Sequence, residues 1–181
     1  MTKMLSLAAA IALVSVVSLS GMQKTTLIHP GEGGSPHVST EWTIAGATIS
    51  IEYGRPYLKG RAIGEDIVPH GEVWRVGADE ATTLTSDKAL VFGGITLPAG
   101  AHTLWVLPTE DKWQLIVNKE TGQFGTDYNA DHDLGRVEMK LDSLGTPAAQ
   151  HTISIDPRPE GGVLRIEFGT AKATVPFTVK K

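Results

Sequence analysis

The sequence of 181 residues contains no cysteine, which excludes a disulfide-bonded scaffold, a thiolate metal site and a cysteine nucleophile. It also lacks a cluster of basic residues: 16 Lys and Arg stand against 20 Asp and Glu, a net charge of -4. Binding along a nucleic acid needs several neighbouring cations to neutralise phosphates, so we expect no nucleic-acid partner. The catalytic patterns G-x-S-x-G, H-E-x-x-H and G-x-x-x-x-G-K are missing too. The sequence therefore assigns no reaction.

One hydrophobic run occurs near the N-terminus, at residues 4–19, after the single charged residue Lys3. This pattern predicts a secretory signal peptide over residues 1–20 with cleavage near Ser20. An uncleaved membrane anchor stays open as an alternative, although the run is shorter than the roughly 20 residues that cross a bilayer. We expect a periplasmic or extracellular protein that is not inserted in a membrane once the signal is removed.

Glycine and proline are concentrated just after this segment, in the stretch HPGEGGSP at residues 29–36. Such a composition opposes regular structure, so residues 21–36 are predicted to form a flexible leader. Residues 37–181 then suit one domain, because 41% of the chain is hydrophobic and its length allows a single sizeable core.

Helical periodicity is nearly absent from residue 38 onward, where apolar residues instead recur at alternate positions. Clear examples are residues 49–53, 113–117, 137–141 and 164–168. Alternation places apolar side chains on one face of a pleated strand. We therefore predict an all-β domain, an antiparallel β-sandwich or jelly roll of about ten short strands.

Turn residues separate these predicted strands. Gly93 and Gly94 lie between two short apolar runs and predict a tight hairpin with two positive φ values. Residues 156–162 contain two prolines and two glycines and predict another reversal. Pro176 cannot donate to a strand ladder, which favours an edge position for the last strand.

Residues 54–80 show neither helical periodicity nor the alternation of a strand. A segment of this length without regular structure is unusual as a connection in a compact domain. The strand expected at residues 101–107 is apolar on both faces, with Leu104 and Val106 on one face and Trp105 and Leu107 on the other. We therefore expect the irregular segment to pack on the outer face of that sheet, covering Trp105 or forming a cleft with it.

The same segment carries the candidate site. Arginine side chains match carboxylate or phosphate oxygens, and an adjacent aromatic face can stack on a sugar or another ring. The candidate ligand-binding residues are Tyr53, Arg55, Arg61, Trp74, Arg75 and Glu80. The alternative is that the arginines pair with Glu65, Asp66, Glu72 and Asp79 and hold the segment in place.

Three stretches also carry a family resemblance: ISIEYGRP at 49–56, KGR at 59–61 and IVPHGEVWRVGADEAT at 67–82. The sequence resembles the bacterial domain-of-unknown-function 2911 family over roughly residues 35–181. The resemblance implies a secreted bacterial domain and supplies no activity. His70 and His102 occupy positions where members of the family often have tyrosine.

Metal binding has two weak sequence signals. Asp127, Asn129, Asp131 and Glu138 match four positions of a calcium loop, but His132 stands where that loop needs glycine. A polar turn explains the same residues. A transition metal at His70 and His102 is a further alternative. We predict no metal and no cofactor.

These observations lead to a prediction of an exported binding or structural module with a small anionic or carbohydrate ligand as its possible partner. The alternative function is a hydrolase or lyase with acid–base residues among Glu72, Asp79, Glu80 and His70. A protein-interaction surface at the strand of Pro176 is a third possibility. The sequence leaves the oligomeric state open.

Overall fold

The computed structural model describes residues 23–181, and nearly all of its regular structure is β-strand. The prediction of a signal peptide over residues 1–20 lies outside the described residues. No helix in the described part of the chain has the length and apolar character needed to cross a membrane.

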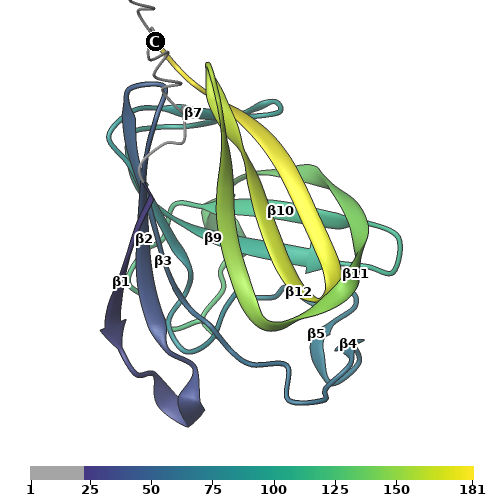
Figure 1. The fold of residues 1–181 in the computed structure, drawn as a ribbon. Helices are drawn as coiled ribbons and strands as arrows, with labels where there is room; N and C mark the ends of the chain where they lie inside the picture. Colours follow the sequence, from purple (N-terminus) through teal and green to yellow (C-terminus); the bar gives the residue numbers. More distant parts are fainter. Residues whose placement is uncertain (1–22) are drawn as a thin grey trace, which may run out of the picture.

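The main sheet contains ten strands in the order β1-β2-β3-β6-β9-β10-β11-β12-β7-β8 (Figure 1). The elements are β1 (Gln23–His29), η1 (Glu32–Gly34), β2 (His37–Ile44), β3 (Ala47–Gly54), β4 (Ile63–Gly64), β5 (Ile67–Pro69), β6 (Thr83–Ser86), β7 (Leu90–Phe92), β8 (Ile95–Leu97), β9 (Gly100–Pro108), β10 (Trp113–Asn118), η2 (Ala130–His132), β11 (Asp133–Arg158) and β12 (Gly161–Val179).

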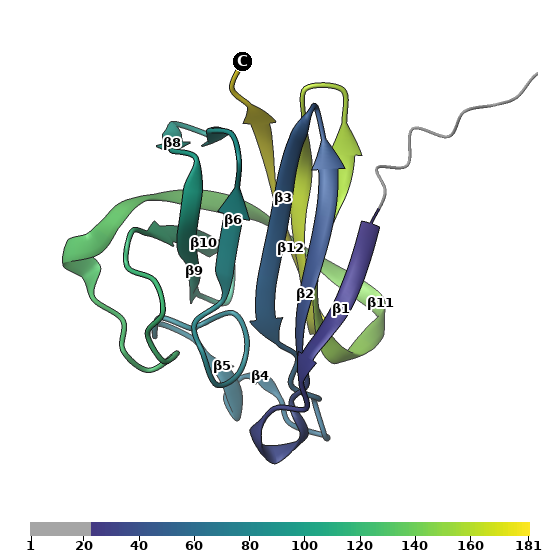
Figure 2. The ribbon, with the colours of Figure 1, turned by 90° about the vertical axis from the view of Figure 1, so that its left-hand side faces the viewer.

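The prediction of an all-β, sandwich-like antiparallel fold is confirmed. All pairs in the main sheet are antiparallel, and the sheet folds back so that its two halves share one core. In Figure 2, β6, β9 and β10 lie to the left of β3, and β12 runs behind β2 and β3. Core side chains from both sides are fully or almost fully buried, as apolar burial is the main favourable term in folding. They include Trp42, Ile49, Ile51, Leu84, Leu104, Leu115, Ile155, Ile166 and Phe168.

Alternation located the strands correctly but not their lengths. β11 has 26 residues and β12 has 19, so several of the predicted short strands are parts of one long hairpin. The register of this pair shifts between Ser143 and Ala148 and again between Ala148 and Thr152. Such bulges bend a strand without ending it. The reversal predicted within residues 156–162 is present, between Arg158 and Gly161.

Two predictions about turns and edges need correction. The hairpin at Gly93 and Gly94 is present, with Phe92 paired to Ile95, but only Gly93 has a positive φ, 56°. β12 is not an edge strand, because β7 pairs with it through Phe177 to Val179. Pro176 is tolerated because it lies just before Phe177, where the pairing of β12 with β7 begins, so no backbone N–H is needed from it in that ladder.

The expectation of an irregular leader over residues 21–36 is also corrected. Gln23–His29 forms β1, which pairs with β2 at the edge of the sheet. Its side chains are exposed from Gln23 to Ile28, so no buried face marks it in the sequence. Its place in the sheet depends on backbone hydrogen bonds, which any sequence without proline can supply.

The irregular segment, residues 54–80, packs on the sheet as expected. Its backbone donates hydrogen bonds from Leu58 to Ala149 and from Gly71 to Pro108, at 2.7 and 2.8 Å. Trp74 exchanges two backbone hydrogen bonds with Val106 of β9, at 2.7 and 2.9 Å. The backbone of the segment therefore finds hydrogen-bond partners in strands of the main sheet. After Gly54, which ends β3, its strands are the short parallel pair β4 and β5.

Trp105 is covered on the outer face, with 1% of its surface exposed. It packs with Ala81 and Ile116, and Val73 and Tyr128 lie against this cluster. Val73 comes from the irregular segment, so the expected covering of Trp105 is present. Tyr128, from the connection between β10 and β11, completes it.

Candidate functional site

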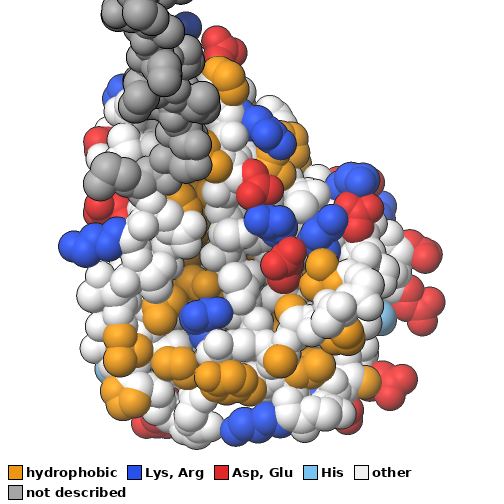
Figure 3. Space-filling model, in the orientation of Figure 1, with side chains coloured by type: hydrophobic (Ala, Val, Ile, Leu, Met, Phe, Trp, Pro, Cys, Tyr) orange, Lys and Arg blue, Asp and Glu red, His pale blue; other side chains and the backbone are white. Residues whose placement is uncertain are grey.

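A cavity of about 610 Å³ lies between the irregular segment and the turn before β2. Its charged and aromatic lining includes three of the predicted site residues, Arg61, Trp74 and Arg75. Tyr57 and Lys59 line it as well. On the face drawn in Figure 3, apolar side chains gather along the lower part, at the level of β4 and β5, with Lys or Arg side chains beside them.

Arg75 is the cation with the fewest partners in this cavity. Its guanidinium lies over the ring of Phe124 at 5.9 Å, and among the described residues it makes no hydrogen bond or ion pair. A guanidinium on an aromatic face keeps its N–H groups at the ring edge available for an anion. Its side chain also passes close to Gly125, which has no Cβ and so leaves room for it.

Arg61 is exposed and is fixed through the backbone of its own segment. It donates from Nε to the Leu58 carbonyl at 3.1 Å and from one terminal nitrogen to the Tyr57 carbonyl at 2.7 Å. The predicted ion pairs of the arginines with Glu65, Asp66, Glu72 and Asp79 are absent from the described residues. Instead, Arg55 and Arg61 donate to carbonyl and hydroxyl oxygens, and Arg75 lies over the ring of Phe124.

The two acidic residues of the cavity wall are occupied by backbone amides. Asp66 accepts from the Ala62 N–H at 2.9 Å, and Asp79 accepts from the Glu32 N–H at 3.1 Å. A carboxylate that accepts hydrogen bonds from the backbone presents less of its charge to a ligand. The cavity thus combines three cationic side chains with two carboxylates that are already engaged.

Tyr53 and Arg55 serve as braces and do not line the cavity. The Tyr53 hydroxyl donates to the Ile153 carbonyl at 3.3 Å and accepts from the Ile153 N–H at 2.9 Å. Burial raises the pKa of this phenol, so it stays protonated as a donor. Arg55 donates to the His151 carbonyl at 3.2 Å and to the Thr152 hydroxyl at 3.0 Å. Both side chains fasten β3 to β11.

Trp74 covers a buried aromatic pocket that the sequence did not reveal. His151 is fully buried, and its ring meets Tyr53, Trp74 and Phe168 edge-on at centroid distances of 5.5, 5.1 and 5.6 Å. Neither ring nitrogen has a hydrogen-bond partner in the described part of the chain. Burial, reinforced by the positive charge of Arg55, lowers the pKa of His151 to about 3, so the imidazole is neutral at pH 7.

Backbone strain accumulates in the cavity wall and next to it. Val68, Val76 and Asp79 have φ values of 56°, 53° and 59°. A β-branched residue in the left-handed region is a rare outlier. Strain of this kind persists where the surrounding packing holds it, and it clusters at functional sites. Val68 and Val76 are both buried, so packing compensates for their conformation.

Glu80, the sixth predicted site residue, lies apart from the cavity wall. Its carboxylate is 3.2 Å from His37 and 3.8 Å from His29, from β2 and β1. Sequence reasoning missed both histidines, because nothing in the spacing between His29, His37 and Glu80 indicates that β1 and the irregular segment meet.

The residues of the predicted metal sites do not meet, and of the acid–base candidates only Asp79 and Glu80 come together, at His37. Asn129 caps η2 by accepting from the Asp131 N–H at 3.0 Å, as expected for a polar turn, and Glu138 lies on β11 beside Lys112. His70 lines a different cavity, next to Trp113. His102 is buried on β9, and its Nδ1 has no hydrogen-bond partner among the described residues.

The fold and the cavity define an all-β, sandwich-like domain with an irregular segment packed on the main sheet and a cavity between that segment and the turn before β2. Residues 35–177 match the family described as protein of unknown function (DUF2911), and the chain belongs to that family. The resemblance noted in the sequence is thereby confirmed. Comparison with curated proteins and with solved structures finds no match.

Proposed function

We propose that this protein is an exported binding module whose cavity takes a small anionic or carbohydrate ligand. Export is supported by the signal-like residues 1–20. The single observation that carries the binding proposal is Arg75, a residue of the cavity lining whose guanidinium lies over Phe124 and has no carboxylate partner among the described residues.

The cavity has a size and composition suited to such a ligand. Its volume of about 610 Å³ falls within the roughly 300–1,000 Å³ that small-molecule sites span. Tyr57 is 43% exposed and can stack against a sugar ring, while Lys59, Arg61 and Arg75 attract negative charge. A negatively charged sugar combines both properties.

The experiment is a binding screen with inorganic phosphate, galacturonate, glucose 6-phosphate and neutral glucose, measured by isothermal titration calorimetry. We expect at least one anionic member to bind, and Arg75→Ala to weaken that binding by about tenfold or more, because a charged hydrogen bond contributes about 1.5–3 kcal/mol. Arg158→Ala removes the same charge from an exposed position and should leave the affinity unchanged.

The melting temperature distinguishes a ligand site from a structural brace. Arg75→Ala should leave it nearly unchanged, because no hydrogen bond or ion pair of the described residues depends on Arg75. A loss of several degrees together with unaltered binding of the same anion would show that Arg75 holds the segment in place and would contradict the proposal.

A further inference from the structure

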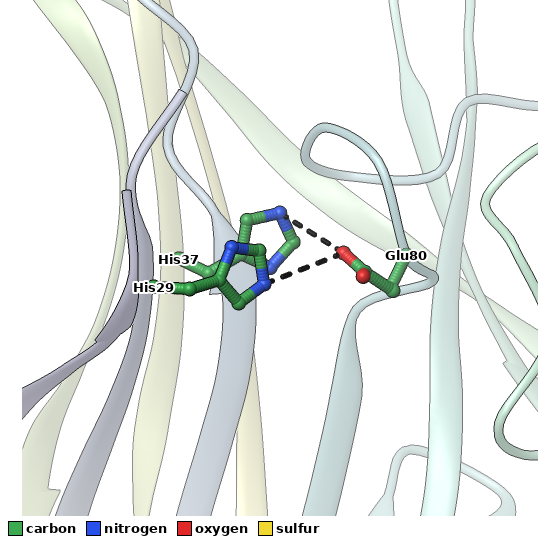
Figure 4. Close-up of side chains that lie close together, drawn as sticks. All are labelled: His29, His37 and Glu80. Carbon is green, nitrogen blue, oxygen red and sulfur yellow. Dashed lines mark ion pairs between the residues drawn. The ribbon is translucent and has the colours of Figure 1, made fainter. Parts of the chain in front are cut away.

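Three potential metal ligands from distant parts of the sequence meet at the edge of the sheet. His29 ends β1, His37 begins β2, and Glu80 is the last residue of the irregular segment. One nitrogen from each histidine and one oxygen of Glu80 all lie within 4.8 Å of one another (Figure 4). The two imidazole rings are stacked at 4.2 Å with an angle of 17°, and their Nε2 atoms both approach Glu80.

The separations between these atoms fit a metal centre. Metal–ligand bonds of about 2.0–2.2 Å in a tetrahedral arrangement place neighbouring ligand atoms about 3.4 Å apart. The Glu80 Oε2 atom is 3.2 Å from Nε2 of His37 and 3.8 Å from Nε2 of His29. Small side-chain adjustments would bring both pairs to the required spacing, and Glu80 is exposed enough to make them, since 57% of its side chain is accessible.

The electrostatics of the site also favour a cation. The His37 side chain is only 2% exposed, yet its Nε2 lies against two carboxylates, 3.2 Å from Glu80 and 3.3 Å from Asp79. Two carboxylates converging on one buried imidazole concentrate negative charge where a cation would sit. Asp79 also accepts from the Glu32 N–H, which fixes its orientation towards His37.

Space for a further ligand adjoins the group. A cavity of about 150 Å³ is lined by His37 and Glu80 together with Glu52 and Gln123. Zinc centres with three protein ligands keep a fourth position for water or another small molecule. The cavity could supply that position beside Glu80.

We propose that His29, His37 and Glu80 bind a divalent first-row transition metal, with Zn²⁺ as the expected ion. Two imidazoles and one carboxylate are ligands that such metals prefer, whereas Ca²⁺ and Mg²⁺ prefer oxygen ligands. The site uses none of the cations of the large cavity, so it stands independently of the proposed ligand binding. It also goes beyond the sequence-based expectation, which assigned no metal.

Metal binding requires a rearrangement at both histidines. Nε2 of His37 donates to the Asp79 carboxylate at 3.3 Å, so coordination through Nε2 moves that proton to Nδ1 and breaks the contact with Asp79. Nδ1 of His29 accepts a hydrogen bond from the Gly31 N–H at 3.1 Å, which places the proton of a neutral ring on Nε2. Coordination through Nε2 moves that proton to Nδ1 and breaks the contact with Gly31. The metal then ties β1 and the start of β2 to the loop at Glu80.

The test is titration of the purified protein with ZnCl₂, followed by calorimetry, and with CoCl₂, followed by the visible absorption of tetrahedral Co²⁺. We expect one ion per chain. Glu80→Gln and His29→Ala should each weaken Zn²⁺ binding by at least about tenfold, since even the loss of a residue that only supports a ligand costs about 10–100-fold. Both side chains are substantially exposed, so both variants should fold.

A second histidine–glutamate pair provides the matched control. Nδ1 of His132 lies 3.0 Å from the Glu120 carboxylate. Among the described residues, no third potential ligand joins this pair to form a metal site. His132→Ala and Glu120→Gln should therefore keep the affinity of the unmodified protein. The proposal is overturned if Zn²⁺ shows no saturable binding, if the Glu80 and His29 variants bind it as tightly as the unmodified protein, or if Ca²⁺ binds equally well.

Discussion

Buried His151 should make the folded protein lose stability as the pH falls below neutral. Its pKa is lowered from 6.5 to about 3 by burial, so between these values the unfolded chain holds a proton that the folded chain excludes. The free energy of unfolding then decreases by about 1.4 kcal/mol per pH unit. At pH 5, about 1.5 units below 6.5, the loss from this residue is about 2 kcal/mol. Burial also lowers the pKa of His102, which adds a contribution of the same sign.

The variant His151→Leu isolates the contribution of this residue. The ring is surrounded by Tyr53, Trp74 and Phe168 and neither of its nitrogens has a partner, so leucine leaves no polar group unsatisfied. Removing buried, unpartnered polar atoms recovers about 1–3 kcal/mol, which offsets the imperfect fit of the smaller side chain. We expect the stability at pH 7 to be similar to that of the unmodified protein.

The assay is urea denaturation followed by tryptophan fluorescence at pH 7, 6 and 5. The free energies of the unmodified protein and of His151→Leu should diverge by about 1.4 kcal/mol per pH unit below pH 6.5. Ile153→Val is the control: it lowers stability by about 0.5–1.5 kcal/mol and should leave the pH dependence unchanged. Parallel lines for the unmodified protein and His151→Leu from pH 7 to 5 would refute the reasoning.

Three further substitutions test the packing around the site by urea denaturation. Tyr53→Phe leaves the buried carbonyl and N–H of Ile153 without the phenol and should cost about 1–3 kcal/mol. Gly54→Ala should destabilise the protein, because the added Cβ would lie 2.4 Å from the Ala78 carbonyl oxygen. Ala45→Asn should stabilise it by up to about 1 kcal/mol, because Ala45 has a φ of 50° in a two-residue hairpin where asparagine is favoured.

Matched changes at positions without these contacts serve as controls. Tyr57→Phe removes a hydroxyl from a side chain that is 43% exposed and should have little effect. Gly145→Ala adds a methyl group with nothing within 4 Å and should be neutral. Equal losses at Tyr53 and Tyr57, or at Gly54 and Gly145, would show that the named contacts do not determine stability.

The fold was predictable where one face of a strand is buried. Ile49, Ile51 and Tyr53 alternate with exposed or partly exposed residues on β3, so the sequence carries the period of the pleat. β1 was missed because its side chains are almost all exposed and its place depends on backbone pairing with β2. The long hairpin of β11 and β12 was divided into shorter strands because bulges interrupt the alternation there.

The candidate site was predictable only within one segment. Arg61, Trp74 and Arg75 lie within 15 consecutive positions of the irregular segment, and the structure brings them to one cavity. Arg55 differs because its partners are 96 and 97 positions away on β11, which turns a candidate ligand residue into a brace. The meeting of Glu80 with His29 and His37 likewise depends on pairing between distant strands, which no local spacing encodes.

The central claim is that residues 54–80 form an ordered cover on the sheet and thereby shape the cavity. Hydrogen exchange resolved to single amides tests it most directly. The N–H groups of Leu58, Gly71 and Trp74 donate to carbonyls of β11 and β9, so we predict that they exchange far more slowly than in an unfolded chain. Exchange of all three amides at the rate of an unfolded chain would contradict the account.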